Sequence, residues 1–244
     1  MNIIIEKDYE QLSKTTMQLL LAHMYKPKKV HLAITAGSTP IRMYELLTEE
    51  LKQKNTSPFK NITYYNFDEI PFKGEDRPGV TISNLDKYFF TPAGIPKEQI
   101  HALDYSNYKK HDEYLESIGG LDAILLGLGA DGHFCGNLPG TTTFTDKTVE
   151  VPLDSRPDMR EILLGEVDGD ATKIPDGYIT MGPRSVMNVR EVIMFASGKK
   201  KAEIVREAFF GPVTEDVPSS VFQLHPNFTL ILDEEAASCI QNLI

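Results

Sequence analysis

Runs of apolar residues recur along the chain, and each is followed by a glycine-containing turn and then by a helical pattern. Short apolar runs bounded by turn signals are typical of buried strands. We expect such strands at residues 30–37, 61–70, 121–133, 191–198 and 228–238. Strands that alternate with helices favour a parallel sheet covered on both faces. The pattern therefore predicts an α/β fold, in which a doubly wound, mostly parallel sheet has helices on both faces in a Rossmann-like three-layer sandwich.

The segments that follow two of these strands have helical patterns. Residues 38–54 place apolar side chains at helical spacing. Residues 199–211 do the same and end at Gly211, a residue that is common at the C-terminal end of a helix. The sequence contains no internal repeat, low-complexity tract or long linker. We therefore expect residues 1–244 to form a single domain.

The composition is that of an ordinary globular protein, with 41% hydrophobic and 25% charged residues. The formal net charge of -10 argues against nucleic-acid or membrane partners, because both select for basic surfaces. The N-terminal segment lacks a signal-peptide pattern, and no window reaches the roughly 18 apolar residues of a membrane helix. The two cysteines are too few for a disulfide framework. We therefore expect a cytoplasmic protein.

Polar segments follow four of the predicted strands. They lie at residues 37–40, 68–69, 129–133 and 197–201. In open sheets of this kind, ligands bind outside the carboxyl ends of the strands. We therefore expect these four segments to meet at one binding site.

The first of these segments has the features of an anion-binding loop. Gly37 allows a sharp turn, and Ser38 or Thr39 can cap the helix that begins near Pro40. The free N–H groups at a helix N-terminus favour an anion such as phosphate. The same residues also fit a plain helix start.

Lysines open the helix predicted after the fourth strand, at residues 199–201. A cation at that end of a helix opposes the helix dipole unless the cation binds an anion.

Two other segments carry groups that can transfer protons. Asp131 and His133 lie two residues apart in a glycine-flanked turn, where the carboxylate can fix the tautomer of the imidazole. Asp68 and Glu69 follow an aromatic strand, where burial could raise a carboxylate pKa toward that of a working base. Each of these residues alone also fits a turn or a helix cap.

No HxH or HxxxH spacing supports a metal, so we expect no metal or other cofactor.

Five segments together resemble the superfamily of glucosamine-6-phosphate isomerases/deaminases and 6-phosphogluconolactonases. They are TAGSTPIRMYELL, YYNFDEI, GLGADGHFCGNLPG, SGKKKAEIV and FQLHPNFTLILDE, in this order between about residues 30 and 235. The chain looks especially similar to a deaminase-like bacterial branch that carries NFDEIPF and GPVTEDVP. The resemblance implies a small-molecule sugar phosphate as the ligand.

The resemblance also implies roles for individual residues. Gly37, Ser38, Thr39 and Lys201 match the groups that hold the sugar phosphate. Glu69 and Gly132 lie within the same motifs, and we count them among the substrate-binding residues.

The catalytic roles that the resemblance implies differ between the two activities. In the deaminases, the residue matched by Asp68 moves a proton between C1 and C2, and the pair matched by Asp131 and His133 opens the sugar ring. In the lactonases, the histidine matched by His133 activates water.

The chain departs from both patterns. Deaminases have GHxxxNEP, but here Leu138 takes the place of the glutamate, as a hydrophobic residue does in lactonases. Lactonases in turn show DER where this chain has DEI, and the QLHP segment at 223–226 is deaminase-like. The segment LLGEVDGD lacks the phosphate-binding arginine of the deaminases, for which Arg160 or Arg184 could substitute.

Three functions remain open from the sequence. The first is isomerisation and deamination of an amino-sugar phosphate, such as glucosamine- or galactosamine-6-phosphate, with Asp68 and His133 moving the protons. The second is hydrolysis of a phosphorylated sugar lactone. The third is a non-catalytic sugar-phosphate sensor, but such regulators carry a helix-turn-helix segment, and we expect no room for one in 244 residues. The oligomeric state is left open.

Overall fold

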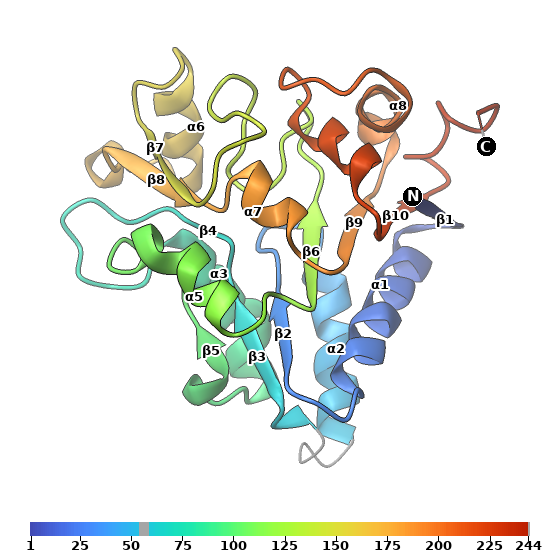
Figure 1. The fold of residues 1–244 in the computed structure, drawn as a ribbon, viewed down its shortest axis with the longest axis horizontal. Coiled ribbons are helices and arrows are strands. Elements are labelled where there is room, and N and C mark those ends of the chain that lie inside the picture. The colour runs from blue at the N-terminus through green and yellow to red at the C-terminus, as the bar shows by residue number, and fades with distance from the viewer. Residues whose placement is uncertain (54–58, 244) are drawn as a thin grey trace.

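The computed structural model describes residues 1–53 and 59–243 and shows a parallel sheet at the centre of the fold (Figure 1). In the described residues this sheet has seven strands in the order β1-β10-β9-β6-β2-β3-β5. Their bounds are β1 (Asn2–Glu6), β2 (Val30–Ala33), β3 (Ile62–Tyr65), β5 (Ile100–His101), β6 (Ala123–Gly127), β9 (Val192–Ala196) and β10 (Phe228–Asp233).

Helices connect the strands. Their bounds are α1 (Tyr9–Met24), α2 (Ile41–Gln53), α3 (Val80–Leu85), α4 (Thr91–Ala93), α5 (His111–Ser117), α6 (Met159–Glu166), α7 (Pro183–Met187) and α8 (Ala202–Phe210). A π-helical turn spans Asp86–Phe90, and 3-10 turns span Lys97–Gln99, Tyr108–Lys110, Ala171–Lys173, Lys199–Lys201 and Pro218–Leu224. None of the helices within 1–53 and 59–243 has the length and apolar character needed to cross a membrane.

Helices cover both faces of the parallel sheet. Strand β6 shows why, because Ala123 and Leu125 belong to one apolar core, whereas Ile124 and Leu126 belong to another. Helices α1 and α2 pack in the first core, and α5, α7 and α8 pack in the second. A strand buried on both faces needs a nearly continuous apolar sequence. The predicted doubly wound α/β fold is thus confirmed.

A second, antiparallel sheet of three strands was not predicted. It consists of β4 (Asp68–Glu69), β8 (Gly177–Thr180) and β7 (Val149–Pro152), with β8 in the middle. A third apolar cluster joins this sheet to α6. In Figure 1, β7, β8 and α6 lie at the upper left, on the side toward which β6 points. The small sheet is therefore placed near the carboxyl ends of the parallel strands.

The prediction of one strand over 61–70 was wrong. Strand β3 ends at Tyr65, and the chain then joins the other sheet as β4. Between them Asn66 is fully buried, and its side-chain amide donates to the carbonyls of Asp68 and Leu103 at 2.9 and 3.0 Å. Its side-chain oxygen accepts from the Leu103 N–H at 2.7 Å. These bonds replace the ladder bonds that a continuous strand would make.

Other differences concern short elements and helix ends. Strands β1 and β5 were not predicted, and β5 has only two residues, too few for a periodic pattern. The helix predicted at 38–54 begins at Ile41, and its last predicted residue, Lys54, lies outside the described residues. Helix α8 ends at Phe210 and is closed by Gly211, as predicted; a Cβ atom on Gly211 would lie 2.4 Å from the carbonyl oxygen of Glu207.

A cluster of histidines and tyrosines lies at strands β2, β3 and β5 and at helix α5. The rings of His101 and Tyr114 stack at 4.1 Å, and His31 Nδ1 lies 2.8 Å from the Tyr65 hydroxyl. His111 is 1% exposed, and neither of its ring nitrogens has a hydrogen-bond partner among the described residues. Burial lowers the pKa of His111 to about 4 and also lowers the pKa values of His31 and His101.

We predict that mild acid destabilises the fold through His111. The unfolded chain takes up this proton near pH 6.5, but the folded chain does so only near pH 4. The free energy of unfolding should therefore fall as the pH drops from about 6.5 to about 4, by on the order of 3 kcal/mol for this residue. Urea unfolding of the unmodified protein and of His111→Phe across this range tests it. The variant should show a shallower fall, and parallel curves would contradict the prediction.

Candidate active site

One cavity lies between the carboxyl ends of the parallel strands and the small sheet. Its volume of about 380 Å³ is within the usual range for small-molecule sites. It collects residues from the ends of four strands and from α6 and β8. The predicted site residues that line it are Gly37, Thr39, Asp68, His133 and Lys201.

The predicted anion loop follows β2. Gly37 has a φ of +101°, a conformation that side chains disfavour, and it lines the cavity together with Thr39. The loop is fixed from outside, because the Tyr9 hydroxyl donates to the Thr39 carbonyl at 2.8 Å and the Tyr44 hydroxyl donates to the Thr35 carbonyl at 2.6 Å. Ser38 is exposed and does not line the cavity.

Lys201 brings a positive charge to the same cavity. It ends the 3-10 turn before α8, and its Nζ donates to the carbonyl of Leu128. It forms no ion pair with a carboxylate among the described residues. Burial lowers the pKa of Lys201, and an anion bound in the cavity would offset this cost. The loop and the lysine thus line the same cavity, and their joint binding of a phosphate stays a prediction.

His133 lines the cavity and is oriented by Asp131. Its Nδ1 lies 2.6 Å from Asp131 Oδ1, and its backbone N–H donates to the same oxygen at 3.2 Å. Burial raises the pKa of Asp131, but the hydrogen bond and the charge of His133 outweigh this effect and lower the pKa to about 2. Gly129 makes room, since a Cβ atom there would lie 2.1 Å from His133 Nδ1.

The partners of His133 in the motif do not line the cavity themselves. Asp131 contacts the imidazole from outside, and Gly132 shapes the turn with a φ of +84°. The Gly132 carbonyl accepts from the Ser219 N–H at 2.9 Å. A substrate contact by Gly132 remains a prediction.

Asp68 lines the cavity from β4. Thr81 Oγ1 donates to its carboxylate at 2.9 Å. Burial raises the pKa of Asp68 to about 6, with a further contribution from the charge of Glu166, while the bond from Thr81 and the charge of His133 act in the opposite direction. A carboxyl group with such a pKa can both accept and return a proton near neutral pH.

Glu69 does not line the cavity. It is 3% exposed, and its carboxylate accepts from the backbone N–H groups of Ile70, Thr81 and Ile82 at 3.0, 2.8 and 3.2 Å. The carboxylate therefore holds the first turn of α3, and with it Thr81, beside Asp68. This geometry gives Glu69 a supporting role, and its predicted contact with substrate stays a prediction.

The loop after His133 is bound to β8. The Gly136 N–H donates to Thr180 Oγ1 at 2.9 Å, and the Tyr178 hydroxyl donates to the Gly136 carbonyl at 2.7 Å. Leu138, from the same loop, is 7% exposed; it lines the cavity and packs in the third apolar cluster. The position that holds a glutamate in the deaminase pattern therefore presents an apolar side chain here.

Several residues of the cavity were missed from the sequence. Glu166, Thr81 and Tyr178 line it, although each comes from a segment without a recognisable motif. Neither Arg160 nor Arg184 lines it, and both are exposed.

A different arginine approaches the site from outside the cavity. Arg156 lies 3.9 Å from Asp131 Oδ2 and binds Asp158 at 2.6 Å. No group of three metal-ligating side chains occurs in the part of the chain that the structure describes.

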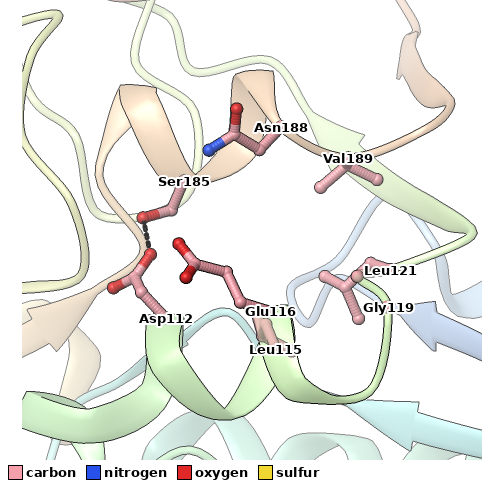
Figure 2. A pocket seen from close by; sticks show the side chains of 9 residues that line it. Asp112, Leu115, Glu116, Gly119, Leu121, Ser185, Asn188 and Val189 are labelled. Atoms are coloured by element: carbon pink, nitrogen blue, oxygen red, sulfur yellow. Dashed lines mark hydrogen bonds between the residues drawn. The ribbon is translucent and has the colours of Figure 1, made fainter.

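A second cavity, of about 320 Å³, lies between α5 and α7 (Figure 2). Figure 2 shows Asp112 of α5 and Ser185 of α7 facing each other across it, joined by a hydrogen bond. Most of its lining is apolar or glycine, and it holds none of the predicted site residues. The chemistry expected from the sequence therefore belongs to the first cavity.

The fold and the first cavity define an α/β protein with a candidate site for a small anion beside a carboxyl group and a histidine. The family of glucosamine-6-phosphate isomerases/6-phosphogluconolactonase matches residues 6–230. The chain belongs to this family, whose name describes action on sugar phosphates. The resemblance seen in the sequence is thus confirmed.

Individual relatives cover nearly the whole chain. The glucosamine-6-phosphate deaminase of Thermoanaerobacter pseudethanolicus is 32% identical, and the match covers 98% of this chain and 95% of that protein. The glucosamine-6-phosphate deaminase of Halalkalibacterium halodurans is 34% identical, and the match covers 97% of this chain and 96% of that protein. The structure of a monomeric glucosamine-6-phosphate deaminase matches with a TM-score of 0.83 at 29% identity, over 98% of this chain and 100% of that one. A 6-phosphogluconolactonase from Trypanosoma cruzi shares the fold, with a TM-score of 0.75 at 18% identity. The match covers 98% of this chain and 97% of that one.

We predict that Lys201→Ala weakens the binding of phosphorylated sugars. Loss of a charged hydrogen bond in a half-buried site should lower affinity about 10- to 100-fold. Calorimetric titration with a phosphorylated sugar alcohol measures the effect, and a melting curve checks that the fold is kept. Lys200→Ala, on the exposed side of the same turn, is the matched control. Equal affinities of the two variants would contradict the prediction.

Proposed function

We propose that this protein is an amino-sugar-6-phosphate isomerase/deaminase of the glucosamine- or galactosamine-6-phosphate type. The observation that carries the proposal is the single cavity in which an anion loop and Lys201 lie together with Asp68 and His133. The loop and lysine suit the phosphate, and the other two residues suit proton transfer. The curated relatives at about 30% identity are named as deaminases of this kind, which supports the assignment.

The chemistry divides between the two proton-transfer groups. His133, held by Asp131 through Nδ1, gives a proton to the ring oxygen as the C1–O bond of the ring breaks, and the hydroxyl on C1 gives up its proton to leave an aldehyde. Asp68 then takes the proton from C2 of the open-chain sugar and returns it to C1, while the C1 oxygen gains a proton and the amino group on C2 loses one. The C2 imine formed in this way takes up water and releases ammonia, leaving the ketose phosphate.

Hydrolysis of a phosphorylated sugar lactone is the second candidate. It is favoured by Leu138, which places an apolar side chain where the deaminase pattern has a glutamate. In that reaction His133 would activate a water molecule. Incubation with phosphorylated amino sugars and lactones, followed by assays for ammonia, ketose and lost lactone, separates the two.

We predict that the deaminase reaction depends on the ionised form of Asp68. Because burial raises the pKa of Asp68 to about 6, the group is protonated and inactive as a base below that pH. The value of kcat/KM should then fall about tenfold per pH unit below pH 6. Asp68→Asn should lower turnover by roughly a hundredfold or more and remove this acid limb. An acid limb that persists unchanged in the residual activity of the variant would exclude Asp68 as its source.

We predict weak or undetectable ammonia release from glucosamine-6-phosphate, because Leu138 cannot hold the His133 tautomer or stabilise its charged form. Leu138→Glu should recover activity only modestly, since the new carboxylate would enter an apolar cluster. A coupled ammonia assay on both proteins measures this. Turnover by the unmodified protein at about 10 per second, the median for enzymes, would show that Leu138 does not limit the reaction.

A further inference from the structure

The two oxygens of the Asp68 carboxylate have different surroundings. Thr81 Oγ1 donates to Asp68 Oδ1 at 2.9 Å, whereas Asp68 Oδ2 has no hydrogen-bond partner in the described part of the chain. The backbone of Asp68 is fixed as well, because the Asn66 side-chain amide donates to the Asp68 carbonyl at 2.9 Å. The side chain that carries these two unequal oxygens lines the cavity.

Thr81 is held in place by contacts between the chain around β4 and the start of α3. It is 5% exposed, and its backbone N–H donates to Glu69 Oε1 at 2.8 Å. The Val80 N–H donates to the Ile70 carbonyl at 2.9 Å. Gly79 permits this close approach, because a Cβ atom there would lie 2.4 Å from the Ile70 carbonyl oxygen and 2.5 Å from Glu69 Oε1. A β-branched side chain on a backbone fixed in this way has little freedom to turn its hydroxyl away.

A hydrogen bond to one oxygen has two effects on a carboxyl group. It selects one orientation of the carboxyl plane, which otherwise turns about a broad, roughly twofold torsion. It also stabilises the ionised form, and so opposes the rise in the pKa of Asp68 that burial causes. Without the hydroxyl of Thr81, Oδ1 would lose its donor, and the carboxyl group would keep its proton to a higher pH.

Building on the proposed function, we propose that Thr81 is a positioning residue that holds Oδ1 of Asp68 and leaves Oδ2 as the oxygen that takes the proton from the substrate. Thr81 acts through Asp68 and takes no part in the transfer itself. A serine can fill this role because it has the hydroxyl. A valine cannot, although it has the same branched shape.

The other titratable groups around Asp68 stay the same when only Thr81 is changed. Glu166 of α6 raises the pKa of Asp68, and His133 lowers it. The remaining groups whose charges interact with that of Asp68 are Glu69, Cys135 and Tyr178. A change in the titration of Asp68 on substitution of Thr81 therefore reports the hydroxyl.

Titration of the Asp68 carboxyl group tests the proposal without any substrate. Carbon NMR of protein labelled at the aspartate carboxyl carbons follows it, and Asp68→Asn identifies the signal. In Thr81→Val the midpoint should rise by about one pH unit from about 6, and Thr81→Ser should restore it. Thr81→Ala lacks the hydroxyl too and replaces Thr81→Val if that variant does not fold. Ser83→Ala is the matched control, because the Ser83 hydroxyl on the same helix donates to the Pro78 carbonyl at 3.2 Å.

Kinetics with an amino-sugar phosphate test which oxygen takes the proton. In Thr81→Val the acid limb of kcat/KM should move to higher pH with the midpoint. At a pH above that limb, kcat should fall about tenfold with little change in KM, because the carboxyl plane is no longer fixed. A rise in kcat there would mean that Oδ1, freed from its donor, is the better base, and would overturn the assignment of Oδ2.

The outcomes separate this inference from the proposed function. An unchanged midpoint in Thr81→Val, or an equal rise in Ser83→Ala, would overturn the role of Thr81. A purely structural role would lower the melting temperature of Thr81→Val without moving the midpoint. Absence of ammonia release from every amino-sugar phosphate would instead overturn the proposed function, and the titration would still decide whether Thr81 holds the carboxylate.

Discussion

The site depends on one threonine in the middle strand of the small sheet. Thr180 of β8 pairs with Asp68 of β4 on one side and with Val149 of β7 on the other. Its hydroxyl also accepts from the Gly136 N–H at 2.9 Å, three residues after His133. Two segments that leave different strands of the large sheet are thus tied to one fully buried residue. This shared attachment fixes the positions of Asp68 and His133 relative to each other, which the proposed proton transfers require.

The charges of the cavity follow from what each group can pair with inside the protein. Asp131 is paired with His133 at 2.6 Å, and the carboxylate of Glu69 is occupied by three backbone N–H groups. Both therefore support the site from outside the cavity. Lys201 and Glu166 have no charged partner within hydrogen-bonding distance among the described residues, and they face the cavity. Groups left unpaired in this way are those that a ligand of complementary charge can satisfy.

Motifs in the sequence pointed to the candidate cavity but did not distinguish the residues that line it from those that support it from outside. Ser38 stands between Gly37 and Thr39, which line the cavity, yet it is exposed and does not line the cavity itself. Thr81 was missed because its role arises from a contact with Asp68 across 13 residues of chain. Glu166 was missed for a similar reason, since a glutamate near the end of an amphipathic helix usually faces solvent.

The sequence by itself determined the doubly wound sheet, the family and the strand ends at which the candidate site lies. It could do so because buried parallel strands and the turns after them impose continuous apolar runs and glycines that local reading detects. Only the tertiary structure decided that the chain leaves β3 at Asn66 for a second sheet, and that this sheet carries Asp68 to the cavity. Those facts depend on hydrogen bonds between residues about 40 to more than 100 positions apart, and such pairings leave no periodic signal in the sequence.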